Sequence, residues 1–276
     1  MALHLSWDFI FGVLANIISA MVCVAPLPTF YQICKKKTSE GFQSIPYIIA
    51  LFSAMLWLFY AIFDDDSTLL ITINSFTFFM ETGYLSVYLI YATKKDRMFT
   101  AKLILFFNVF GFGMICILTL FLTHGRKRVD VLGWICMIFA LCVFVAPLAI
   151  MRKVIKTKSV EFMPFSLSFF LTLSAVMWFF YGFLKKDLYV TIPNTLGFLF
   201  GIIQMVLYLI YRDTKKVSVK EPKICEFYEH IVDVAKLSAT EITTVVVPQP
   251  NNNGNHVEDQ KVKKENKQSM DVPNKV

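Results

Sequence analysis

The chain has 276 residues, of which 56% are hydrophobic and only 17% carry a charge. Soluble domains usually carry about 25% charged residues, so this composition excludes an ordinary soluble protein. The net charge of +7 gathers between long apolar segments. That clustering is the signature of membrane topology, and it argues against nucleic acid as a partner.

Seven apolar segments follow one another along the chain, each close to the roughly 20 residues that a membrane-spanning helix needs. They cover residues 7–30, 43–63, 67–91, 103–123, 131–151, 162–184 and 188–211. The residues before the first segment lack the basic region of a signal peptide, so we expect that segment to be a retained helix. The remainder, 212–276, is polar and almost free of aromatic residues, which predicts a disordered tail.

The basic residues predict an orientation, because cytoplasmic loops collect lysine and arginine. The loops after the first, third and fifth segments are rich in them: Lys35, Lys36, Lys37, Lys94, Lys95, Arg97, Lys102, Arg152, Lys153, Lys156 and Lys158. The opposite loops hold fewer: Arg126, Lys127, Arg128, Lys185 and Lys186. We therefore expect a multi-pass protein with the N-terminus outside and the tail in the cytosol, although the basic loop at 126–128 weakens the contrast.

An internal repeat runs through these segments. SAMLWLFYAIFDDD at 53–66 returns as SAVMWFFYGFLKKD at 174–187, so that Asp66 pairs with Asp187 in this alignment. APLPTF pairs with APLAIM, KKKTSEGFQSIPY with KTKSVEFMPF, ITINSF with VTIPNTL, and YLIY occurs in both halves. Segments one to three (7–91) therefore match segments five to seven (131–211), and the fourth (103–123) stands alone. Three membrane crossings end on the side opposite to their start, so a second copy joined directly would be inverted. The single fourth helix adds one crossing and lets both copies point the same way. We therefore expect an all-helical membrane protein with two parallel three-helix repeats joined by a linker helix (3+1+3).

The paired polar and aromatic residues are the candidate site. Asn74 and Asn194 offer neutral amide donors and acceptors, which suit a polyol better than an ion. Trp57 and Trp178 lie one helical turn after Ser53 and Ser174, and a flat aromatic face beside amides suits a sugar ring. Helix-to-helix hydrogen bonds for the asparagines, and packing or an interfacial belt for the tryptophans, remain alternatives.

Four prolines lie near the predicted cytosolic ends of segments: Pro26, Pro46, Pro147 and Pro164. They predict a ring of hinges, although prolines are also common in membrane helices by chance. Tyr60, Tyr181 and Asp187 lie at the opposite rim and are candidates to close it. Glu81 has no acidic counterpart in the second repeat, so it has either a local role or a role in handling substrate or protons.

Together these motifs closely resemble the plant SWEET sugar transporters of the MtN3/saliva family, over residues 9–212. The resemblance implies bidirectional, gradient-driven sugar movement by alternating access between two triple-helix bundles. It implies the proline tetrad, the sugar-contacting asparagines and tryptophans, and an outer gate of Tyr60, Tyr181 and Asp187. It also implies smaller pocket-lining positions at Ser19, Val22, Ser53, Val143 and Ser174. The acidic run at 64–66 departs from the family at the rim.

The resemblance is greatest to the group associated with sucrose, and Val143, smaller than methionine, leaves room for a disaccharide. The expected function is therefore a passive uniporter for sucrose in a plant plasma membrane, with hexose or another small solute as an alternative cargo. A seven-helix receptor is the alternative of another class. No enzyme signature, metal site or cofactor motif is present in the sequence, and association into homo- or hetero-oligomers is left open.

Overall fold

The structure, a computed structural model, describes residues 6–39, 41–160, 163 and 165–212. The expected tail beyond Arg212 and the candidate hinge Pro164 lie outside these residues. The described residues form helices and turns, without a strand. The helices are α1 (Trp7–Val24), α2 (Leu27–Lys36), α3 (Ile45–Phe63), α4 (Thr68–Tyr91), α5 (Lys94–Ile104), the π-helix η1 (Leu105–Gly111), α6 (Phe112–Leu122), α7 (Arg126–Val143), α8 (Val145–Thr157), α9 (Phe165–Lys185) and α10 (Leu188–Tyr211).

Six helical stretches in the described part of the chain are long and apolar enough to cross a membrane. They are Trp7–Lys36, Ile45–Phe63, Lys94–Leu122, Arg126–Thr157, Phe165–Lys185 and Leu188–Tyr211. The predicted segment 67–91 is α4, which at 24 residues is as long as α10. It is less apolar than those six stretches because Thr72, Asn74, Thr77, Glu81 and Thr82 interrupt it with polar groups. With the six stretches, α4 makes seven helices, and it packs on both α1 and α3.

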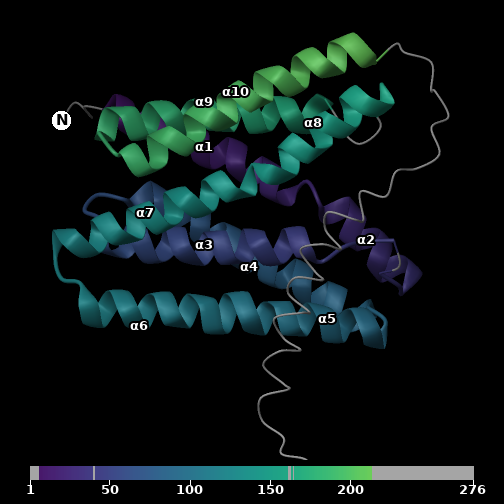
Figure 1. Cartoon of the computed structure of the whole chain (residues 1–276), viewed down its shortest axis with the longest axis horizontal. Helices are drawn as coiled ribbons and strands as arrows, with labels where there is room; N and C mark the ends of the chain where they lie inside the picture. The colour runs from purple at the N-terminus through teal and green to yellow at the C-terminus, as the bar shows by residue number, and fades with distance from the viewer. Residues whose placement is uncertain (1–5, 40, 161–162, 164, 213–276) are drawn as a thin grey trace, which may run out of the picture. The chain divides into compact units, whose positions relative to one another are not determined.

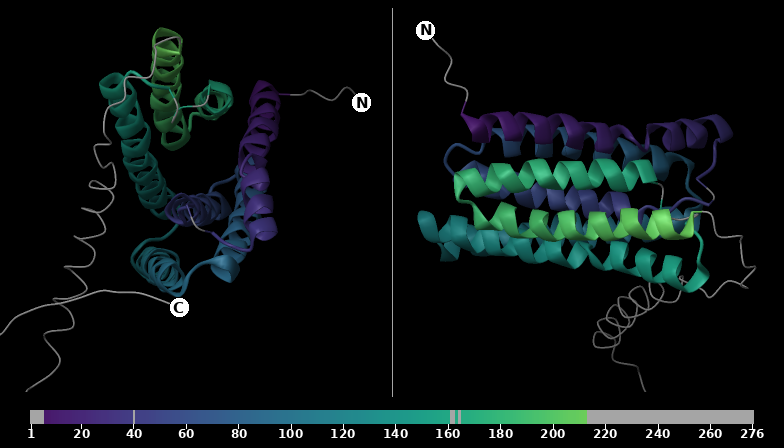
Figure 2. Two further views of the ribbon diagram at one scale, coloured as in Figure 1. Left: turned by 90° about the vertical axis from the view of Figure 1, so that its right-hand side faces the viewer. Right: turned by 90° about the horizontal axis from the view of Figure 1, so that it is seen from above.

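The helices form two bundles with the same internal order. In the first bundle α4 packs between α1 and α3, and in the second α10 packs between α7 and α9. The bundles meet at two seams, α1 against α9 and α3 against α7. The linker, α5 to α6, packs on α3 and α4 beside the first bundle, and Figure 1 shows α6 running alongside α3. The end-on view in Figure 2 looks along these helices.

The backbone repeats as closely as the sequence does. Lys37 and Lys158 both have a positive φ, of 54° and 51°, and end α2 and α8 respectively. Asp66 and Lys186 form a second such pair, with φ of 59° and 58°. Because non-glycine residues rarely adopt this conformation, matched pairs of them mark equivalent turns. The equivalent of Asp66 is therefore Lys186, and the equivalent of Asp187 is Ser67, so the pairing of Asp66 with Asp187 expected from sequence is wrong by one residue.

The two ends of the bundles differ in how they are packed. We call the end with the turns at Asp66 and Lys186 the Asp187 end, and the end with the turns at Lys37 and Lys158 the proline end. The largest buried apolar cluster draws on both bundles and includes Leu56, Leu132 and Val190. The described clusters nearer the proline end draw only on the first bundle and its linker. The bundles are therefore joined through a core at the Asp187 end and not at the proline end.

Candidate functional site

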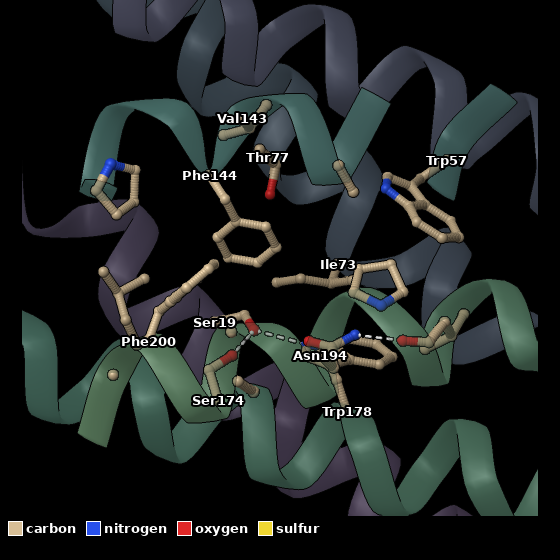
Figure 3. A pocket seen from close by; sticks show the side chains of 18 of the residues that line it. Ser19, Trp57, Ile73, Thr77, Val143, Phe144, Ser174, Trp178, Asn194 and Phe200 are labelled. Atoms are coloured by element: carbon tan, nitrogen blue, oxygen red, sulfur yellow. Dashed lines mark hydrogen bonds between the residues drawn. The ribbon is translucent and has the colours of Figure 1, made fainter. Parts of the chain in front are cut away.

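A cavity of about 500 Å³ lies between the two bundles. Its volume falls within the range of roughly 300–1,000 Å³ that is typical of small-molecule sites. Figure 3 shows side chains from both bundles turned toward it. Every described helix of the two bundles except α2 contributes to the wall, and none of the lining residues is charged. Such a cavity suits a neutral, partly polar solute.

The two asparagines line this cavity from equivalent positions. The Asn74 Nδ2 donates to the Leu70 carbonyl over 2.9 Å, and the Asn194 Nδ2 donates to the Val190 carbonyl over 2.7 Å. Each bond ties the amide to its own helix one turn back and leaves the second N–H and the Oδ1 without a partner among the described residues. The site therefore holds a matched pair of oriented amides with free donors and acceptors.

The two tryptophans also line the cavity, but their indole N–H groups differ. The Trp178 Nε1 donates to the Ser19 Oγ over 2.9 Å, and that Oγ lies 2.8 Å from the Ser174 Oγ. This group of three residues joins α1 to α9 (Figure 3). On the equivalent seam between α3 and α7, the counterpart of Ser19 is Ala140, which has no hydroxyl. The Trp57 N–H consequently has no partner among the described residues and is available to a ligand.

A layer of buried tyrosines closes the Asp187 end. Tyr60 and Tyr181 are each 2% exposed, and each packs edge-on against the tryptophan three residues before it. The Tyr60 hydroxyl donates to the Asp187 Oδ2 over 3.0 Å, which ties α3 to the start of α10. The other carboxylate oxygen of Asp187 accepts from the backbone N–H groups of Tyr189 and Val190 as the N-cap of α10. In this conformation the three expected gate residues lie together and the Asp187 end is closed.

Burial and hydrogen bonding act in opposite directions on Asp187. Burial raises the pKa of its carboxyl above the ordinary value, while the hydrogen bonds from Tyr60 and from the N-terminus of α10 offset part of that rise. Tyr181 has no equivalent bond, and its buried hydroxyl has no partner among the residues that the structure describes. The one-residue correction explains this, because the residue equivalent to Asp187 is Ser67, whose hydroxyl is occupied by Asp64.

Comparisons with known proteins decide which family this arrangement represents. The model of the MtN3/saliva family, described as "Sugar efflux transporter for intercellular exchange", matches residues 9–96 and 130–216. Those two segments cover nearly all of the two bundles and leave most of the linker unmatched. The chain belongs to the MtN3/saliva family.

Individual members of the MtN3/saliva family are similar over most of their length. "Bidirectional sugar transporter SWEET10" of Arabidopsis thaliana is 59% identical over 231 residues, which is 83% of this chain and 80% of that protein. "Bidirectional sugar transporter SWEET15" of Oryza sativa subsp. indica is 53% identical over 84% of this chain and 76% of that protein. The solved structure of a eukaryotic SWEET transporter has a TM-score of 0.71 at 31% identity, covering 75% of this chain and 97% of that one.

In this MtN3/saliva protein the structure brings most of the sequence candidates together. The lining residues include Ser19, Trp57, Asn74, Val143, Ser174, Trp178 and Asn194. Ser53 and Val22 were expected beside them, but both are half-buried outside the lining. Glu81, expected on the same helix face as Asn74, is also not in the wall; it is 6% exposed, and its Oε2 has no described partner.

The described prolines occupy three different positions. Pro26 stands at the break between α1 and α2 and caps α2. Pro147 lies in the first turn of α8, where the break from α7 falls at Phe144, and it lines the cavity. Pro46 is the second residue of α3, a position where helices accept proline without bending. Two of the candidate hinges therefore coincide with breaks in a helix, and Pro46 begins one.

Sequence reasoning missed several residues of the cavity wall, because they have no match in the repeat. Thr77, Phe144, Phe200 and Gln204 all line it. One signal was present along α10, where small and polar residues recur at helical spacing: Asn194, Gly197, Gly201 and Gln204. Residues spaced by three and four positions share one helix face, so this stripe marks the face of α10 turned to the cavity.

Proposed function

We propose that this protein is a facilitative sugar transporter that moves sucrose in either direction by alternating access between its two bundles. The observation that carries the proposal is the matched pair Asn74 and Asn194, one from each repeat, in the wall of one uncharged cavity. Amides beside tryptophan faces recognise the hydroxyls and the apolar C–H faces of a sugar ring. The sugar-transporting relatives support the same class of cargo.

The uncharged wall and the repeated half-sites favour a sucrose transporter over an amino-acid carrier or a signalling receptor. A zwitterionic amino acid needs charged partners, and none of the described lining residues supplies one. A signalling receptor has no need of two equivalent half-sites, each presented by its own bundle. Val143 lines the cavity and leaves space that a methionine would fill, which favours a disaccharide over a hexose.

The proposed cycle rests on the difference between the two ends. The Asp187 end is closed by Tyr60, Tyr181 and Asp187, while the cavity extends toward the proline end. In the proposed setting, the plasma membrane of a plant cell, the predominance of lysine and arginine at the proline end supports a cytosolic position for that end. The described conformation is then inward-facing, and the breaks at Pro26 and Phe144 are where α2 and α8 swing to close the inner side.

Flux through purified protein in liposomes tests the proposal. Vesicles are loaded with labelled sucrose, ionophores remove every ion gradient, and efflux is followed; uptake is then measured with the label outside. We expect movement in both directions that stops at equal concentrations. A requirement for a proton or sodium gradient would contradict the uniport mechanism, and protein that carries no sugar would contradict the transport function.

A further inference from the structure

The cavity continues well beyond the level of the asparagines. Along α10 its lining runs from Asn194 through Gly197 and Gly201 to Gln204. Ten residues of α-helix rise by about 15 Å, so Gln204 lies on a second level nearer the proline end. A single sugar ring held by the asparagines and tryptophans does not reach that far.

This second level belongs to one bundle only. The repeat aligns Phe144, Phe200 and Gln204 with Cys23, Met80 and Tyr84. Tyr84 is 3% exposed, donates to the Cys23 carbonyl over 3.0 Å and stacks on Phe30 at 4.4 Å between ring centres. The first bundle is therefore filled with side chains at this level, and the corresponding part of the second bundle is open.

The open side carries the same chemistry as the asparagine level. The Phe144 and Phe200 rings lie 5.3 Å apart, with Phe144 seated against Gly197, where a Cβ would only just fit. Gln204 is half-buried in the wall, and its carboxamide has no partner among the described residues. Figure 3 shows Phe144 and Phe200 reaching into the cavity, with the Thr77 hydroxyl pointing into it from the other wall.

We propose that Phe144, Phe200 and Gln204 form a second sugar-ring subsite, which lets the carrier distinguish a disaccharide from a hexose. The asparagines and tryptophans that are matched in the repeat hold one ring. The unmatched residues hold the other ring: the Phe144 and Phe200 faces contact its C–H groups, and the Gln204 amide forms hydrogen bonds with its hydroxyls. This inference rests on the proposed function and deepens it. It explains why the cavity is asymmetric although the bundles that build it are repeated.

The test is Gln204→Met, which keeps the length and apolar volume of the side chain and removes the amide. Labelled sucrose and labelled glucose are exchanged at equilibrium in the same batch of vesicles. We expect the half-saturating sucrose concentration to rise about threefold to tenfold, the effect of one neutral hydrogen bond. Glucose exchange should stay within about twofold of wild type, because a hexose at the asparagines does not touch Gln204.

Tyr84→Phe is the matched control, since it removes a hydroxyl at the equivalent position of the other repeat, inside packed core. It should change the exchange of both sugars by the same factor. Equal loss of sucrose and glucose exchange in Gln204→Met, or no change in either, would overturn the subsite. Wild-type protein that exchanges neither sugar would instead overturn the proposed function, so the two failures are distinct.

Discussion

At the scale of single residues, the two halves of the site place the same residue types at equivalent positions but differ in their hydrogen bonds. Trp178 donates its indole N–H to Ser19, whereas the repeat position of Ser19 on the other seam is Ala140, and the Trp57 N–H has no partner among the described residues. Tyr60 donates to Asp187, and Tyr181 has no hydrogen-bond partner in the described part of the chain. Ser19 therefore acts at the junction of the bundles as well as at the cavity wall.

Ser19→Ala should destabilise the protein. The substitution leaves the Trp178 N–H and the Ser174 hydroxyl without their shared partner, which costs about 1–2 kcal/mol. For a chain of this size that lowers the unfolding midpoint by roughly 2–8 °C, measured by thermal unfolding in detergent. Ala140→Ser is the control, because it adds the hydroxyl to the other seam and breaks no bond. Equal midpoints for Ser19→Ala and wild type would show that the group of three residues does not hold α1 to α9.

At the scale of elements, close approach of helices at the Asp187 end depends on matched glycines. A Cβ added to Gly12 of α1 would overlap Leu69 and Tyr181, and one added to Gly133 of α7 would overlap the Tyr189 ring. The positions are equivalent in the repeat. The start of each bundle's first helix is thus pressed against the tyrosine layer and its neighbours, which is how the closed end excludes solvent.

Gly133→Ala should therefore be destabilising although alanine favours helices. The methyl group has to displace the base of the Tyr189 ring, and overpacking of this kind costs about 1–3 kcal/mol. The control is Gly113→Ala in α6, where nothing lies within 4 Å of the added Cβ. That variant should be neutral or more stable by up to about 1 kcal/mol, through helix propensity alone. The thermal unfolding midpoint should thus fall in Gly133→Ala and stay or rise in Gly113→Ala, and a Gly133→Ala midpoint that does not fall would refute the packing argument.

The elements were predictable from sequence to the extent that hydropathy and the repeat record them. Seven helical crossings and their 3+1+3 order follow from apolar length and parity. The limits of the crossings do not, since α2 and α8 remain helical past residues 30 and 151 and carry lysines in their last turns. Lysine favours the C-terminal turn of a helix and reaches water with its long side chain, so helix and apolar segment end at different residues.

Residues of the site were predictable where the repeat duplicates them or where the family resemblance implies them, as it does for Ser19 and Val143. The asparagines Asn74 and Asn194 and the two tryptophans were recognisable in the sequence because each occurs as a matched pair. Phe200 and Gln204 were not, because their counterparts are packed inside the first bundle. The repeat offset falls from 121 residues at Ser53 and Ser174 to 120 at Asn74 and Asn194, so the sequence implies a one-residue gap. Its position before Asp66 became clear only when the positive φ of Asp66 and Lys186 aligned the turns.

At the scale of the whole molecule, two similar bundles share a core at one end and a cavity toward the other. Rigid bundles that separate at one end while meeting at the other are what alternating access requires. The matched asparagines lie where both bundles contribute to the wall. In the proposed cycle, a sugar bound there would touch both bundles at once, so the same residues would serve binding and transport.

The most direct test is sucrose counterflow in liposomes, comparing wild type with Asn194→Ala and with Thr195→Ala. Thr195 is the next residue on α10, lies outside the cavity wall and bonds only its own helix. We predict that Asn194→Ala loses sucrose exchange by about tenfold or more, the loss of one or two hydrogen bonds to the sugar, while Thr195→Ala exchanges like wild type. If Asn194→Ala exchanged sucrose as fast as wild type, in vesicles holding equal amounts of folded protein, that result would contradict the assignment of the paired asparagines as the sugar site.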